Sequence, residues 1–186
     1  MRWLCLDLGE KRTGVALSSP EGTFAVPLLV VEHGIEGPSP GEIARLLQEH
    51  AAEGLVIGLP LSLSGNPSQQ TWFALGVARR IAMYLGTSLP LPDSVSGQAE
   101  SRAIVEVEAG PHGARESVVI VLWDERLSTW DAGRLLPDES PRRRGPRRKA
   151  RRLDAHAAAL ILQSYLDSLQ QGQVRDSDSN PEADLS

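Results

Sequence analysis

Three short apolar runs separated by glycine-containing turns occupy the first 32 residues, and this spacing restricts the fold more than any other feature. The runs cover residues 2–8, 15–19 and 24–32. Each has the length of a β-strand, and the connections between them are too short for the helical crossover that joins parallel strands. The sequence therefore predicts an antiparallel three-strand meander at the start of the chain.

Helix-like and strand-like segments alternate after the meander. The short apolar run at residues 55–59 is typical of a central strand that is covered on both faces. Another apolar strand is expected at residues 117–125, and helices are expected at about residues 39–53, 66–86, 129–136 and 153–169. This order predicts an α/β fold with a mixed five-stranded sheet, built from the meander plus parallel strands and flanked by helices.

The length of 186 residues suits one domain with a complete hydrophobic core. We expect that domain to span residues 1–170. Proline and glycine punctuate a polar stretch at about residues 87–116, which we interpret as an insertion, and a basic loop is expected at residues 137–152. Residues 171–186 are polar and acidic, which is typical of a disordered tail.

Several classes of protein are disfavoured by composition. No apolar run approaches the roughly 20 residues that a membrane span needs, so no membrane association is expected. The first strand-like run starts at residue 2, so we expect no secretory leader. The single cysteine, Cys5, excludes an internal disulfide framework and a cysteine-based zinc site. These features favour a cytoplasmic protein.

The charge distribution points to a polyanionic partner although the net charge is −5. Eight of the chain's 19 basic residues lie within residues 142–152, a segment that contains no acid. An isolated basic run is often only a solvated loop. This one leads directly into the expected final helix, and we therefore interpret it as a nucleic-acid contact. Its basic residues are Arg142, Arg143, Arg144, Arg147, Arg148, Lys149, Arg151 and Arg152.

Three acidic residues lie where core elements meet loops. Asp7 and Glu125 each follow an apolar strand-like run, and Asp154 lies on the apolar side of the expected final helix. A carboxylate near a core is costly unless it is paired, protonated or bound to a cation. If the strands ending at Asp7 and Glu125 are neighbours, the three side chains converge. The pattern then predicts a site for Mg²⁺ or Mn²⁺, with two ions able to support phosphodiester hydrolysis.

Each acid also has a simpler explanation. Asp7 could be a turn residue before Gly9, Glu125 could pair with Arg126, and Asp154 could cap the final helix. For any one residue alone this simpler explanation is favoured, whereas the three together favour the metal site.

Four segments in this order resemble the YqgF family, also called RuvX, whose members are described as pre-ribosomal RNA nucleases and Holliday-junction resolvase homologues. The segments are Asp7-Leu-Gly-Glu-Lys-Arg-Thr-Gly-Val-Ala, Gly58-Leu-Pro-Leu, Trp123-Asp-Glu-Arg-Leu-Ser-Thr and Asp154-Ala-His-Ala-Ala-Ala-Leu-Ile-Leu-Gln-Ser-Tyr-Leu. The resemblance covers about residues 1–86 and 117–169. It implies an RNase H-like fold and a role in maturing the 5′ end of 16S ribosomal RNA.

The resemblance also implies roles for individual residues. It makes Asp7, Glu125 and Asp154 the catalytic metal ligands, in agreement with the choice made from the residues themselves. Lys11 and Arg12 match the family's basic turn and are expected to meet phosphate, and Arg126 is expected to orient Glu125 or to contact substrate. The chain departs from the family pattern at Ser62 and Ser64, where Asn and Asp are common, and this departure puts the substrate preference in doubt.

The sequence therefore predicts a metal-dependent nuclease with nucleic acid as its partner, RNA more than DNA, acting as a monomer or homodimer. Two alternatives stay open. One is a Holliday-junction resolvase, which would need a dimer to present two sites. The other is a non-catalytic RNA-binding protein of ribosome biogenesis.

Overall fold

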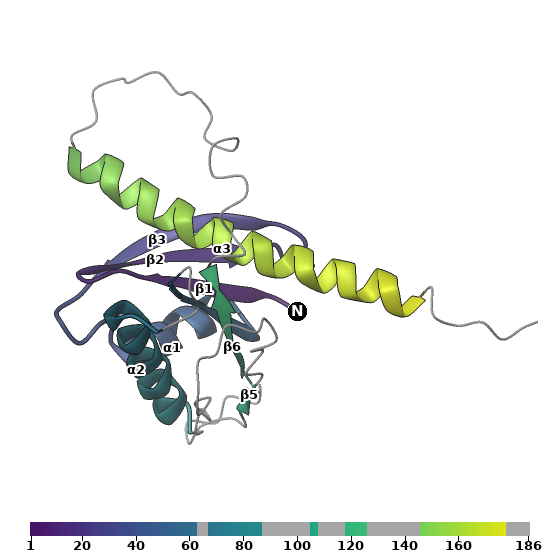
Figure 1. Ribbon diagram of the computed structural model, residues 1–186, viewed down its shortest axis with the longest axis horizontal. Helices are drawn as coiled ribbons and strands as arrows, with labels where there is room; N and C mark the ends of the chain where they lie inside the picture. The colour runs from purple at the N-terminus through teal and green to yellow at the C-terminus, as the bar shows by residue number, and fades with distance from the viewer. Residues whose placement is uncertain (63–66, 87–104, 108–117, 126–145, 178–186) are drawn as a thin grey trace, which may run out of the picture.

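A computed structural model describes residues 1–62, 67–86, 105–107, 118–125 and 146–177, and of residues 105–107, 146–152 and 172–177 it describes the backbone alone. Apart from an additional short strand at residues 105–107, the described strands and helices follow the order expected from the sequence (Figure 1). In chain order they are β1 (Trp3–Leu8), β2 (Arg12–Ser18), β3 (Ala25–Glu32), α1 (Pro40–Glu49), β4 (Gly54–Leu59), α2 (Gln69–Tyr84), β5 (Val105–Val107), β6 (Val118–Asp124) and α3 (Pro146–Ser177).

The strands form one mixed sheet in the order β3-β2-β1-β4-β6-β5. β1, β2 and β3 make the predicted antiparallel meander, and β4 pairs in parallel with both β1 and β6. The predicted α/β, RNase H-like arrangement is therefore confirmed. A sixth strand extends it, because β5 pairs antiparallel with β6 from within the segment that the sequence marks as an insertion.

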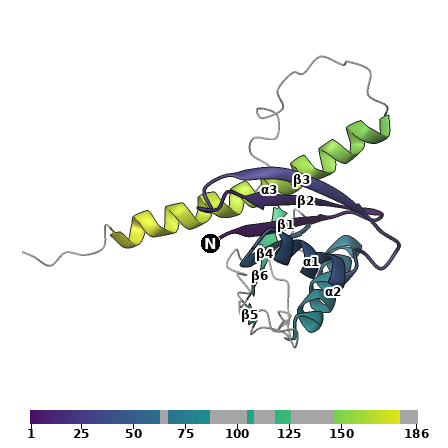
Figure 2. The same cartoon turned by 180° about the vertical axis from the view of Figure 1, so that it is seen from behind.

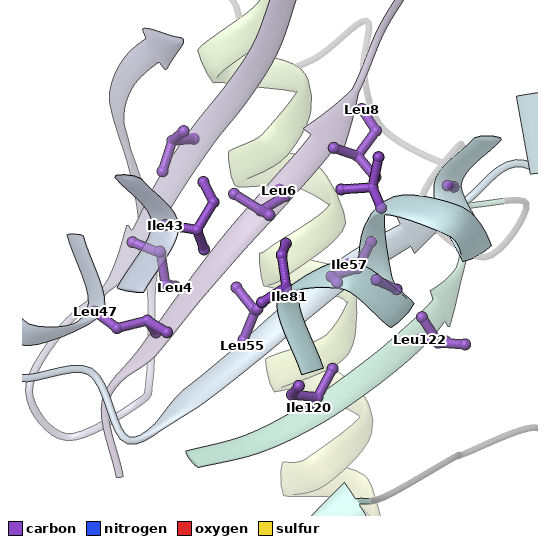
Figure 3. Close-up of a cluster of buried hydrophobic side chains, with 14 of the residues drawn as sticks. Leu4, Leu6, Leu8, Ile43, Leu47, Leu55, Ile57, Ile81, Ile120 and Leu122 are labelled. Atoms are coloured by element: carbon purple, nitrogen blue, oxygen red, sulfur yellow. The ribbon is translucent and has the colours of Figure 1, made fainter. Parts of the chain in front are cut away.

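Helices cover both faces of the sheet. α1 and α2 lie together on one face and α3 crosses the other, as the two opposite views show (Figures 1 and 2). Successive side chains of a strand point to opposite faces of the sheet, so alternate residues pack against α1 and α2 on one face and against α3 on the other. On β1, Leu4, Leu6 and Leu8 join the core beneath α1 and α2 (Figure 3). Trp3 and Cys5 join a smaller core beneath α3.

The final helix differs from the sequence prediction at both ends. α3 begins at Pro146 and ends at Ser177, whereas a helix over about residues 153–169 was expected. The predicted loop over residues 137–152 is therefore wrong for residues 146–152, and the predicted disordered tail is wrong for residues 171–177. Proline suits the first turn of a helix, and arginine and lysine are good helix formers, so the basic run continues the helix toward its N-terminus.

Other predicted segments have different outcomes. The helix expected at residues 129–136 and most of the insertion at residues 87–116 lie outside the described residues, as does the tail beyond residue 177. α2 begins two residues later than expected, because Ser68 rather than Asn66 caps it by accepting a hydrogen bond from the backbone N–H of Thr71. In the part of the chain that the structure describes, no helix is long and apolar enough to cross a membrane.

Candidate active site

Asp7 and Glu125 lie at the carboxyl ends of two parallel strands, on the face that α3 covers. Asp7 follows Trp3 and Cys5 at alternate positions of β1, and both of those side chains belong to the core beneath α3. Glu125 directly follows β6 and keeps the alternation of Val121 and Trp123, which belong to the same core. The sequence argument required the strands that end at these two acids to be neighbours, and they are not, because β4 lies between β1 and β6 and pairs with both.

Glycine residues allow α3 and Glu125 to approach the sheet closely. Gly14 is the register partner of Asp7 on β2. A Cβ atom on Gly14 would lie 2.0 Å from the backbone oxygen of Asp154, so α3 rests on β2 at the position opposite Asp7. A Cβ atom on Gly58 of β4 would lie 2.5 Å from Oε1 of Glu125. These two close approaches place all three predicted carboxylate residues around one end of the sheet.

Burial and mutual repulsion raise the pKa values of the site. The pKa of Asp7 rises from 3.8 to about 6, first because the carboxyl is buried and second because Asp154 lies nearby. Burial, followed by Asp7 and Asp124, raises the pKa of Glu125 from 4.5 to about 7. The buried Cys5 thiol also has a raised pKa, through burial and then the charges of Asp7 and Glu125. Ionisation of Asp7 and Glu125 is therefore less favourable than in water, and a cation bound between them would offset this cost.

One positive charge already lies beside the site. Nε of Arg12 is 2.9 Å from Oδ2 of Asp154, and the two side chains are 40% and 29% exposed. The same Oδ2 atom is buried and accepts no hydrogen bond of acceptable geometry from the residues that the structure describes. The short distance and the missing hydrogen bond are compatible, because the guanidinium can attract the carboxylate by its charge while its N–H bonds point away from this oxygen. Arg12 therefore partly compensates the charge of Asp154, and it would compete with a second cation for this oxygen.

The donor set suits a hard divalent cation. Carboxylate oxygens are the ligands that Mg²⁺ and Mn²⁺ prefer, and three carboxylates that repel one another gain from a shared cation. Among the described residues, however, no group of three or more His, Cys, Asp or Glu side chains is arranged closely enough to hold a metal ion. The three side chains thus fit the ion by chemistry and by their common face of the sheet, and they would have to move closer together to coordinate it.

The predicted basic contacts divide into three groups. Lys11 and Arg12 lie at the turn between β1 and β2, next to Asp7, with Lys11 exposed. Arg126, Arg142, Arg143 and Arg144 lie outside the described residues. The others belong to the first turns of α3, immediately before Asp154, and are Arg147, Arg148, Lys149, Arg151 and Arg152. A basic helix start, and not a loop, therefore leads into the site.

Nothing in the sequence indicated the two side chains at the start of α2 that attach this helix to the strand ends next to Asp7. Gln70 Nε2 donates to the backbone oxygen of Leu8 at 2.6 Å, and the Thr71 hydroxyl donates to the backbone oxygen of Pro60. These bonds attach the start of α2 to the strand ends beside Asp7. The importance of Gly14 and Gly58 for close packing was also not predicted. For Gly14 a signal did exist, because the short turn between the first two strands pairs this residue with Asp7.

A family model described as "RuvX: Holliday junction resolvase" matches residues 1–110 and 89–168. The chain belongs to the RuvX family. Relatives of this RuvX chain that carry the name "Putative pre-16S rRNA nuclease" occur in Pelotomaculum thermopropionicum and Syntrophus aciditrophicus. The first is 34% identical, covering 94% of this chain and 91% of the relative, and the second is 33% identical, covering 94% and 93%.

A solved structure, Thermus thermophilus RuvC in complex with a Holliday junction substrate, is similar with a TM-score of 0.47 and 14% identity. It covers 91% of this chain and 96% of the RuvC chain.

Proposed function

We propose that this RuvX chain is a cytoplasmic metal-dependent nuclease that hydrolyses phosphodiester bonds and takes part in maturing the 5′ end of the 16S ribosomal RNA precursor. The observation that carries the proposal is the placement of Asp7, Glu125 and Asp154 around the carboxyl end of the sheet, where burial and like charge raise the pKa values of Asp7 and Glu125. Membership of the RuvX family and the names of the relatives support the same activity.

The three carboxylates would hold one or two Mg²⁺ or Mn²⁺ ions. When bound, such ions activate water for attack on phosphorus and stabilise the leaving oxygen. The chain's own residues then have three tasks. Asp7 and Glu125 stay ionised once a cation compensates them. Gly14 and Gly58 let α3 and Glu125 pack closely against the sheet. Lys11 and Arg12 bind phosphate next to the carboxylates. The basic start of α3 adds salt-dependent affinity for the substrate backbone.

A Holliday-junction resolvase is the second candidate, and the description of the matching family model favours it. Symmetric cleavage of a four-way junction needs two sites in one particle, so this candidate requires a homodimer. Light scattering of the purified protein tests that requirement, and a monomer at working concentration would remove the resolvase from consideration. A non-catalytic RNA-binding protein is the third candidate, favoured only if the purified protein cleaves nothing.

One experiment separates the three. Wild-type protein and Asp7→Asn are incubated with single-stranded RNA, single-stranded DNA and a four-way junction, in Mg²⁺, Mn²⁺ or EDTA. The proposed function predicts RNA cleavage that requires the metal and is lost in Asp7→Asn, while RNA binding persists. Paired symmetric nicks confined to the junction would support the resolvase instead. An inert wild-type protein in both metals would overturn the nuclease proposal.

A further inference from the structure

The three tryptophans in the part of the chain that the structure describes differ in exposure. Trp3 and Trp123 are 5% and 8% exposed and belong to the core beneath α3, whereas Trp72 is 57% exposed. Neither of the two hydrophobic core clusters includes Trp72. Its neighbour Phe73, by contrast, packs against the core beneath α1 and α2. An exposed aromatic ring of this size offers a flat face on which a planar partner can stack.

The surroundings of Trp72 on α2 are flat and basic. Gly76, Arg79 and Met83 follow it at spacings of four, seven and eleven residues, which place them on the same side of a helix. A Cβ atom on Gly76 would lie 3.9 Å from Nη1 of Arg80, and one on Gly37 would lie 3.4 Å from Nη2 of the same side chain, so the guanidinium lies between α2 at Gly76 and the segment that precedes α1. The result is an aromatic ring followed along the helix by two cations, which we call the α2 track (Trp72, Gly76, Arg79, Arg80).

The charge of α2 identifies the class of partner. The helix sequence contains Arg79 and Arg80 and no acidic residue, in a chain that carries 24 acidic residues against 19 basic ones. Both arginines are exposed. A polyanion with flat rings matches this combination, because bases stack on exposed aromatic side chains while phosphates meet arginine.

The location of the track connects it with the candidate active site. Gln70 and Thr71 attach the first turn of α2 to backbone oxygens at the carboxyl ends of β1 and β4. Trp72 is the next residue, and Asp7 immediately precedes the Leu8 oxygen that Gln70 binds. Trp72 and the carboxylates therefore belong to the same end of the sheet, in the layers that cover its two opposite faces. Figure 2 shows α2 and α3 on these opposite faces.

We propose that the α2 track is a second binding site for single-stranded nucleic acid, in which a base stacks on Trp72 and flanking phosphates contact Arg79 and Arg80. The site rests on the proposed function only for the identity of the strand, which is the unpaired part of the substrate beyond the scissile bond. Its sequence preference is weak, since every base offers a face for stacking.

The test measures binding without cleavage. A fluorescein-labelled single-stranded RNA of about 12 nucleotides is titrated in EDTA against wild type, Trp72→Ala, Trp72→Phe and Phe24→Ala, with fluorescence anisotropy as the readout. Phe24 is the matched control, because this aromatic side chain is 55% exposed but lies next to β3 and away from α2. Unfolding temperatures establish that each variant is folded, and exposed positions are expected to tolerate the changes.

The proposal predicts that Trp72→Ala weakens binding about tenfold, that Trp72→Phe retains most of the affinity, and that Phe24→Ala is unchanged. Arg79→Ala and Arg80→Ala should each lower the slope of log affinity against log salt by about one. Equal affinity of Trp72→Ala and wild type, or an equal loss in Phe24→Ala, would overturn the site. A cleavage assay distinguishes this proposal from the proposed nuclease function. If wild type cleaves nothing but its binding of RNA depends on Trp72, the nuclease function is wrong and the α2 track stands.

Discussion

Asp7→Asn is expected to stabilise the metal-free protein at neutral pH, because it removes a charge that the fold holds at a cost. The pKa of Asp7 is raised from 3.8 to about 6. At about 1.4 kcal/mol per pH unit, that difference corresponds to roughly 3 kcal/mol of stability lost when the carboxyl ionises. The buried amide of asparagine keeps part of the cost of burial. We therefore expect a net gain of about 2 kcal/mol, or a rise of about 4–8 °C in Tm for a chain of this length.

The pH dependence of this gain follows from the direction of the pKa shift. A raised pKa means that the folded state holds the proton more tightly, so wild-type stability is complete below 3.8 and is lost as pH rises through about 6. The gain from Asp7→Asn should therefore be full at about pH 7.5 and small near pH 4. Adding Mg²⁺ should reverse the order by stabilising wild type alone.

Thermal unfolding followed by circular dichroism in EDTA at both pH values makes the comparison. Glu21→Gln serves as the control, since that carboxylate is exposed in the turn between β2 and β3. Stabilisation that persists near pH 4, or a destabilised Asp7→Asn at pH 7.5, would refute the reasoning that repulsion and burial dominate the site.

Three further predictions concern contacts at the site. Gly14→Ala places a Cβ atom 2.0 Å from a backbone oxygen of α3, so we expect the free energy of unfolding in urea to fall by about 1–3 kcal/mol and cleavage to be lost. The control Gly34→Ala has no atom within 4 Å of the added Cβ and should match wild type. Gly58→Ala meets the carboxylate end of Glu125, which can move, so cleavage should fall much more than the unfolding temperature does; equal losses would contradict this. Arg12→Gln removes the cation beside the α3 carboxylate, and calorimetry should show Mn²⁺ binding a few-fold tighter while anisotropy shows RNA binding weaker; unchanged Mn²⁺ affinity would mean that this pair does not oppose metal binding.

The sequence was sufficient for the fold because strand alternation and short turns leave few topologies. Leu4, Leu6 and Leu8 alternate with Trp3 and Cys5 along β1, and the two sets pack in different layers as period-two alternation requires. The same alternation predicts that Asp7 shares the face of Trp3 and Cys5, which α3 covers. Element order and burial pattern are properties that local sequence determines strongly.

Contacts between distant segments could not be predicted in the same way. The approach of α3 to Gly14 depends on how a helix settles on a twisted sheet, and the ion pair between Arg12 and Asp154 follows from that approach. The helical state of residues 146–152 was missed because clustered positive charge was interpreted as a loop, although arginine has a high helix propensity. The exposure of Trp72 could not be predicted either, because periodicity alone does not tell an exposed tryptophan from a buried one.

The most direct test of the account is a titration of Mn²⁺ followed by electron paramagnetic resonance, with wild type and the single variants Asp7→Asn, Glu125→Gln and Asp154→Asn. A site shared by the three carboxylates predicts that each variant binds Mn²⁺ at least about tenfold more weakly than wild type, since each removes one charged oxygen ligand. If Asp154→Asn bound Mn²⁺ as wild type does, Asp154 would be only the partner of Arg12, and the three-carboxylate site would be contradicted.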